Sequence, residues 1–137
     1  MREIKFRAWD ISYKKIITNF AINSVWEEWI SWFVLMLNWV DEKVSKIIHD
    51  ESWYNIMQYT WLKDKNGTEI YEWDVLSSGW ASSYKESISQ VIYKRQLGRY
   101  MKKYNFRWEE VGLDTVVCIR WEVIWNIYEN PNLINND

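Results

Sequence analysis

One short segment, Lys63 to Thr68, constrains the fold most, because it contains the pair Asn66-Gly67. Tight β-hairpin turns need positive φ at both central residues, which Asn and Gly adopt readily. Strand-like residues lie on both sides, at Ile56 to Thr60 and at Glu69 to Tyr71. The sequence therefore predicts a central hairpin, in which the Asp64 side chain stabilises the turn by hydrogen bonds to the backbone.

The first residues predict a second hairpin. Ile4, Phe6 and Ala8 alternate with charged residues, which is the period of a half-buried strand. A turn at Asp10 to Lys15 leads into a second apolar run, Ile16 to Phe20.

The stretch from Val25 to Ile48 permits two interpretations. Its apolar residues are spaced mostly by three or four, which is typical of an amphipathic helix. Phe33 to Leu37 and Lys43 to Ile48 also read as two strands around Asn38-Trp39, and a Gly at position 39 would favour that hairpin strongly.

Later segments give simpler signals. The small polar residues of Ser77 to Ser83 predict a loop. Strands are expected at Ile88 to Tyr93 and Tyr100 to Phe106, with a helix across Ile88 to Ile92 as the alternative. The β-branched residues of Thr115 to Tyr128 predict a strand, and Pro131 to Asp137 a frayed tail.

Composition excludes several classes of protein. The chain has 137 residues, of which 48% are hydrophobic, so it is not disordered. Its net charge of −2 does not suggest a protein committed to nucleic acid or to an anionic membrane. One Cys and one His cannot form an internal disulfide or a zinc site. No signal peptide or membrane span is visible, so we expect a cytoplasmic protein without a membrane partner.

Three blocks of sequence resemble the YopX family of phage and prophage proteins. They are Phe6 to Asp10, Met57 to Leu76 and Glu122 to Pro131, in the order of the family pattern. The resemblance implies a mainly β protein with a small, hairpin-rich N-terminal part, in which a short helix within residues 22–50 is the alternative. A compact, SH3-like β-barrel follows. The expected regions are 1–56, 57–130 and a flexible tail at 131–137.

The chain departs from the family pattern at three glycine positions, where it has Trp61, Trp73 and Trp125. Overall it contains 12 Trp and 4 Gly, whereas average usage of about 7% Gly would give roughly ten. Trp39, Trp53 and Trp108 also stand where a turn glycine would be natural. We hypothesise that the host reads a UGA codon as Gly where this sequence has Trp. If the tryptophans are genuine, strain or exposed indoles are expected at positions 61, 73 and 125.

Few residues suggest catalysis. Asp64, Glu69, Glu72 and Asp74 do not match a calcium-loop spacing, so we interpret them as solvated carboxylates of turns and strand ends. His49 has no nucleophile beside it, and Cys118 lies in an apolar run that would keep its thiol buried. We therefore expect no enzymatic activity, no catalytic residues, no metal and no cofactor. The resemblance to the YopX family implies no catalytic residues either, because that family has no agreed enzymatic activity.

One basic segment carries a binding hypothesis. Six cations between residues 94 and 107 meet no Asp or Glu, and tyrosines lie between them. Basic side chains neutralise phosphates while aromatic rings stack on bases. The candidate nucleic-acid-binding residues are Lys94, Arg95, Arg99, Tyr100, Lys102, Lys103, Tyr104 and Arg107.

Three functional interpretations remain from the sequence. The first is a phage or prophage accessory protein that binds a host or phage macromolecule. The second is a nucleic-acid-binding β-barrel that uses the basic segment. The third is a structural homo-oligomer, which the apolar excess leaves open.

Overall fold

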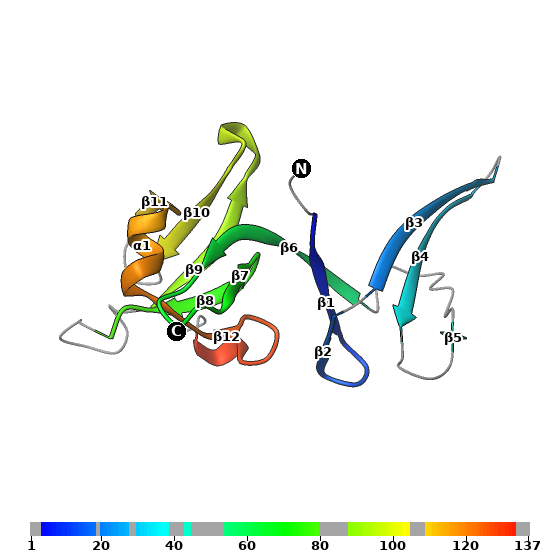
Figure 1. The fold of residues 1–137 in the computed structure, drawn as a ribbon, viewed down its shortest axis with the longest axis horizontal. Helices are drawn as coiled ribbons and strands as arrows, with labels where there is room; N and C mark the ends of the chain where they lie inside the picture. The colour runs from blue at the N-terminus through cyan, green and yellow to red at the C-terminus, as the bar shows by residue number, and fades with distance from the viewer. Residues whose placement is uncertain are drawn as a thin grey trace. The chain divides into compact units, whose positions relative to one another are not determined.

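The protein is described here by a computed structural model (Figure 1). The structure describes residues 4–18, 20–27, 30–38, 43–44, 54–79, 88–104 and 109–133. The chain divides into two compact units, Met1–Met57 and Gln58–Asp137. The predicted mainly β fold is confirmed, because both units consist chiefly of antiparallel strands.

The first unit begins with the predicted N-terminal hairpin. Strand β1 (Phe6–Asp10) pairs with β2 (Lys15–Ile17), and Ala8 lies opposite Ile17. Asp10 begins the turn, and its Oδ1 accepts hydrogen bonds from the N–H groups of Ser12 and Tyr13, each 2.9 Å long. Ala8 is fully buried, as the alternation predicts.

The rest of this unit decides between the two interpretations of residues 25–48. Strand β3 (Phe20–Glu27) pairs with β4 (Ile30–Asn38) along its whole length, from Phe20 opposite Leu37 to Glu27 opposite Ile30. Strand β5 (Lys43–Val44) then pairs with the end of β4. The helical alternative is therefore wrong for the described residues of this stretch, because a long ladder between β-branched and aromatic positions satisfies their backbone groups. Of the predicted strand Lys43 to Ile48, only Lys43 and Val44 lie within the described residues, and they pair with Asn38 and Leu37 as the hairpin interpretation predicts.

The second unit contains the predicted central hairpin. Strand β6 (Tyr54–Lys63) belongs to this unit from Gln58 onward and pairs with β7 (Glu69–Tyr71). Gly67 in the turn has φ +85°, the conformation for which glycine is predicted. The side chain of Asp64 accepts the backbone N–H groups of Asn66 and Thr68, so its predicted role in the turn is confirmed.

A five-stranded antiparallel sheet completes the second unit, in the order β11-β10-β9-β8-β12. Figure 1 shows this sheet as curved. Ile70, Leu76, Val91 and Trp121 form the hydrophobic core of the unit. The strands are β8 (Asp74–Ser77), β9 (Ile88–Lys94), β10 (Arg99–Tyr104), β11 (Glu110–Gly112) and β12 (Glu122–Asn126). The segment that begins at Ile88 is therefore a strand, and the alternative of a helix across Ile88 to Ile92 is wrong.

The prediction of a strand over Thr115 to Tyr128 is wrong in its first half. Thr115–Arg120 form the helix α1, and only Glu122–Asn126 form a strand. Strands β11 and β12 lie at opposite edges of the sheet, so the chain must cross from one edge to the other. The chain makes this crossing as a short helix. The requirement to cross the sheet outweighs the β propensity of the Val and Ile residues in this segment. Within the predicted tail, Pro131–Leu133 form one 3₁₀ turn, η4.

Candidate functional site

The basic segment forms a β-hairpin. Strands β9 and β10 pair from Ser89 opposite Tyr104 to Lys94 opposite Arg99. The 3₁₀ turn η3 (Arg95–Leu97) joins them, and Gly98 closes it with a positive φ and an N–H donated to the carbonyl oxygen of Arg95. Strand β8 pairs with β9 only as far as Gln90, so the ladder of β9 and β10 continues past the end of β8 (Figure 1).

The end of this hairpin presents two cations and an apolar side chain to solvent. Arg95 and Arg99 are exposed, and the exposed fraction of Leu97 is 52%. Between residues 88 and 104 the sequence contains no Asp or Glu. We refer to Arg95, Leu97 and Arg99 as the tip surface.

One face of the hairpin lies beside an acidic residue of β11, Glu110. Side chains alternate along a strand, so Lys94, Arg99, Lys103 and Glu110 share this face. Lys94 forms an ion pair with Glu110. The guanidinium of Arg99 lies beside Gly112, because a Cβ atom added at position 112 would be 3.7 Å from Arg99 Nη1. Lys103 is exposed and lies opposite Glu110. The charge of Lys94 is therefore balanced within the sheet.

The opposite face of the hairpin holds Lys102 and Tyr104, which the sequence analysis predicts to bind nucleic acid at the surface. Lys102 is only 2% exposed, and its Nζ lies 3.6 Å from the centroid of the Trp121 ring and 4.6 Å from that of Tyr104. Tyr104 packs edge-on against Trp121, with 6.0 Å between the ring centroids. Sequence periodicity alone gives no sign of this, because a buried lysine in cation–π contact looks like any other basic residue.

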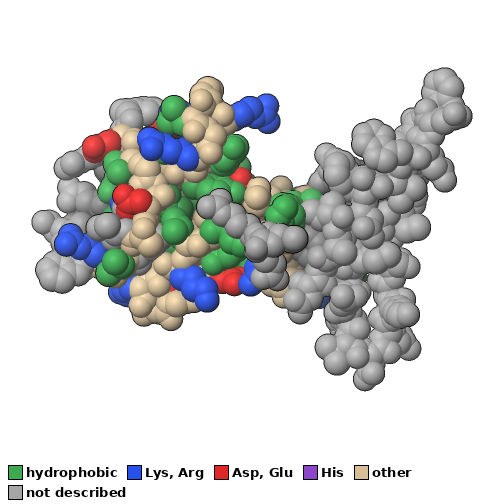
Figure 2. Space-filling view, turned by 45° about the horizontal axis from the view of Figure 1, so that its top comes forward, with side chains coloured by type: hydrophobic (Ala, Val, Ile, Leu, Met, Phe, Trp, Pro, Cys, Tyr) green, Lys and Arg blue, Asp and Glu red, His purple; other side chains and the backbone are tan. Residues whose placement is uncertain are grey.

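The structure brings together only part of the predicted site. It places Arg95, Arg99 and Lys103 at the surface, whereas Lys102 and Tyr104 contact the core. Tyr100 is half-buried against Tyr93, at a ring-centroid distance of 5.2 Å. Arg107 lies outside the described residues. On the face drawn in Figure 2, Lys and Arg side chains lie apart from one another around hydrophobic ones and do not merge into a continuous basic track.

The acidic residues around the central turn are more buried than expected. Asp64 is 6% exposed and Asp74 fully buried, so the interpretation of both as solvated carboxylates is wrong. Asp74 Oδ2 accepts the N–H of Tyr71, and Asp64 Oδ2 accepts the N–H of Val123, at 2.8 and 2.9 Å. These hydrogen bonds offset the cost of burial, and a pattern of charges in the sequence does not disclose them.

The hydrogen bonds to Asp64 also control its ionisation. Burial alone would raise the pKa of its carboxyl, but the N–H groups of Val123, Thr68 and Asn66 outweigh that effect and hold the pKa below its usual range. Lys65 reinforces the same junction, because its N–H donates to the carbonyl oxygen of Trp121 and its Nζ lies 2.8 Å from Glu122 Oε2. The turn is thereby fixed to the start of β12.

Two of the three tryptophans at glycine positions have a glycine-like backbone. Trp61 and Trp73 have φ of +70° and +64°, whereas other L-residues rarely adopt that region. Trp61 lies where the pairing of β6 and β7 shifts register, and Trp73 lies in the turn between β7 and β8. Trp125 follows an irregularity in the pairing of β12 with β8 and is 47% exposed. A strained backbone is thus observed at positions 61 and 73, and an exposed side chain at position 125.

The remaining sequence candidates contribute no assembled site. His49, Trp39, Trp53 and Trp108 lie outside the described residues, and Cys118 belongs to α1 rather than to a strand. Among the residues that the structure describes, no three His, Cys, Asp or Glu side chains are grouped to hold a metal ion. No helix in the described part of the chain has the length and apolar character needed to cross a membrane.

Comparisons with known proteins identify relatives over the whole chain. The model of a family described as YopX protein matches residues 5–135. A crystal structure of protein EF1440 from Enterococcus faecalis is 29% identical, covers 98% of this chain and 100% of its own, and has a TM-score of 0.64. A crystal structure of yopX from Bacillus subtilis is 16% identical, covers 97% of each chain and has a TM-score of 0.61. No curated protein matches the chain.

Proposed function

Because the chain belongs to the YopX family, we propose that it is a phage or prophage accessory protein that acts by binding a macromolecule and not by catalysis. The observation that carries this proposal is the tip surface. Arg95, Leu97 and Arg99 stand at the end of a hairpin that continues past β8, with no acidic residue in either strand.

The chemistry of the tip surface indicates the kind of partner. Two guanidinium groups offer charge-assisted hydrogen bonds to carboxylates or phosphates, and Leu97 adds an exposed apolar side chain in the same turn. Arginine beside exposed apolar residues is a common composition at the centre of protein interfaces. We infer that the partner presents an anionic surface to the hairpin. Photo-cross-linking from position 97, with the exposed position 119 on α1 as control, tests this proposal.

Nucleic acid is the second candidate partner, and the exposure of Arg95, Arg99 and Lys103 supports it. These cations suit phosphate contacts. Base stacking has less support, because Tyr104 packs against Trp121 and Tyr100 against Tyr93.

If nucleic acid is the partner, the variant Arg95→Ala/Arg99→Ala will bind oligonucleotides more weakly and with a shallower salt dependence. Each lost phosphate contact should reduce the slope of log affinity against log salt by about 0.9 on a duplex and about 0.7 on a single strand. Fluorescence anisotropy over a salt series measures this. Lys63→Ala/Arg120→Ala, which removes two exposed cations elsewhere, serves as the control. Absence of binding at low salt would eliminate this candidate.

We also propose that positions 61, 73 and 125 are glycine in the protein made by its native host, because that host reads UGA as Gly. The positive φ at Trp61 and Trp73 supports this, since glycine adopts that region without steric cost. The intact mass of the protein purified from that host decides the matter. A mass that requires 12 Trp would reject the proposal.

A further inference from the structure

Glu72, in the turn between β7 and β8, is a half-buried carboxylate without a cationic partner among the residues that the structure describes. Its Oε2 accepts the N–H of Gln58 at 3.0 Å, and its own N–H donates to the carbonyl oxygen of Gln58 at 2.9 Å. Within the described part of the chain, no Lys or Arg forms an ion pair with it. Burial raises its pKa, and the Gln58 N–H opposes this only in part. The charge of Glu72 is thus poorly compensated by the protein itself.

Backbone hydrogen bonds bring three segments to this carboxylate. The residue after it, Trp73, donates its N–H to the carbonyl oxygen of Val91 in β9, and the carbonyl oxygen of Trp73 accepts the N–H of Ile127. Tyr93 lies two residues beyond Val91, and Tyr128 directly follows Ile127. The bonds therefore place a turn, a hairpin and the segment after β12 beside one another.

These segments carry three tyrosines, Tyr93, Tyr100 and Tyr128. Tyr100 pairs with Tyr93 across the ladder, and their rings meet edge to face at 5.2 Å. Burial and then the charge of Glu72 raise the pKa of Tyr100 to about 12, and the same two causes raise the pKa of Tyr128. Both phenols therefore lie within electrostatic reach of the carboxylate. Tyr93 is 47% exposed and the other three side chains are half-buried, so solvent reaches the group.

An uncompensated carboxylate beside several aromatic rings has the chemistry that binds organic cations. The ring faces attract a positive charge, and the carboxylate supplies a charged acceptor. Among the described residues, Lys94 and Arg99 alternate onto the other face of the hairpin, and Lys102, on the same face, lies against the rings of Tyr104 and Trp121. These three cations are therefore engaged away from Glu72, which leaves the carboxylate open to a cation of another molecule.

We propose that Glu72, Tyr93, Tyr100 and Tyr128 form a binding site for an ammonium or guanidinium group, such as the side chain of a lysine or arginine. We call these residues the tyrosine–glutamate cluster. None of them is a tryptophan, so the site is the same whether residue 73 is Trp or Gly. It shares no residue with the tip surface, and its test is independent of the anionic partner proposed above.

Titration of the protein with N-acetylarginine amide, N-acetyllysine amide and tetramethylammonium, followed by NMR of the tyrosine rings, tests the site. We expect saturable shifts at Tyr93, Tyr100 and Tyr128. Saturation by the two amides identifies an amino-acid side chain as the occupant, and saturation by tetramethylammonium alone identifies a small quaternary amine. No saturable shift with any of the three probes would overturn the proposal.

The variant Glu72→Gln should weaken binding about tenfold, because it removes the negative charge. Its amide oxygen can still accept the Gln58 N–H, so the local structure is kept. Glu69→Gln is the matched control, since Glu69 lies three residues before Glu72, in β7, and its replacement should leave the affinity unchanged. Tyr93→Leu, at an exposed position, should weaken binding about threefold and provides a second variant that does not alter the turn. Unchanged affinity in both Glu72→Gln and Tyr93→Leu would contradict the assignment.

Discussion

Replacement of Asp64 by Ala should lower the free energy of unfolding by about 3 kcal/mol, because three backbone N–H groups lose a charged acceptor. Asn66 and Thr68 donate to one carboxylate oxygen at 2.8 Å each, and Val123 donates to the other at 2.9 Å. The last bond joins the central turn to β12, so the loss extends beyond the turn itself. Urea unfolding at neutral pH measures the change.

The same carboxyl should make stability dependent on acid. Its pKa is lowered by folding, so its contribution is present above the usual value of 3.8 and is lost as pH falls through the folded value. Glu72 has the opposite sign, since its raised pKa gives a contribution present below 4.5 and lost as pH rises through its folded value.

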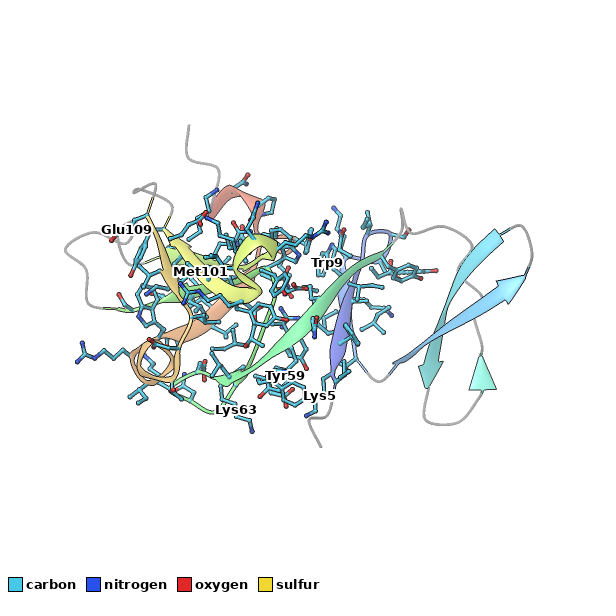
Figure 3. All side chains as sticks on the ribbon, turned by 90° about the horizontal axis from the view of Figure 1, so that it is seen from above. Lys5, Trp9, Tyr59, Lys63, Met101 and Glu109 are labelled. Atoms are coloured by element: carbon cyan, nitrogen blue, oxygen red, sulfur yellow. The ribbon has the colours of Figure 1, made fainter. Side chains whose placement is uncertain are left out.

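The difference in stability between the wild type and Asp64→Asn should therefore shrink from pH 7 to pH 3. Glu109→Gln, at an exposed carboxylate of the same unit (Figure 3), is the control. Its stability relative to the wild type should not change between pH 7 and pH 3. A constant difference between the wild type and Asp64→Asn at every pH would contradict this account of Asp64.

Glycine should be more stable than alanine at positions 61 and 73, by about 1 kcal/mol at each. Both substitutions remove the indole, so the comparison cancels the lost packing, including that of Trp61 on Tyr59 at 5.4 Å. What remains is the cost of a side chain at φ of +70° and +64°. The double variants Trp61→Gly/Trp73→Gly and Trp61→Ala/Trp73→Ala should therefore differ by about 2 kcal/mol in thermal or urea unfolding.

Trp9 supplies the opposite result as a control. It lies in strand β1 and is 7% exposed, and it has no positive φ. Glycine there should be less stable than alanine, because an extended backbone gains nothing from the freedom of glycine and loses chain entropy on folding. Equal stability of Gly and Ala at positions 61 and 73 would show that the backbone there is not strained.

Local chemistry in the sequence is sufficient to predict the hairpins. The Asn66-Gly67 turn and the role of Asp64 follow from residue types that act within a few positions of one another. The alternation from Ile4 to Ala8 likewise predicts the strand β1. Positions 61, 73 and 125 are identified differently, because each departs from the glycine of the family pattern.

Features that depend on distant partners could not be predicted. The burial of Lys102 arises from Trp121, and the ion pair of Lys94 from Glu110, which lies 16 residues away. The helix α1 exists because β11 and β12 occupy opposite edges of the sheet. The tyrosine–glutamate cluster brings together residues from 72 to 128, and its only sequence signal is a modest excess of tyrosine.

Photo-cross-linking in the native host tests most directly whether the tip surface binds the partner. A benzophenone side chain at position 97 should give a single predominant adduct, and one at position 119, where Ile119 is 69% exposed, should give none. Arg95→Ala/Arg99→Ala should abolish the adduct, and its sensitivity to protease or nuclease identifies the partner as protein or nucleic acid. An adduct from position 119 and none from position 97 would contradict the account.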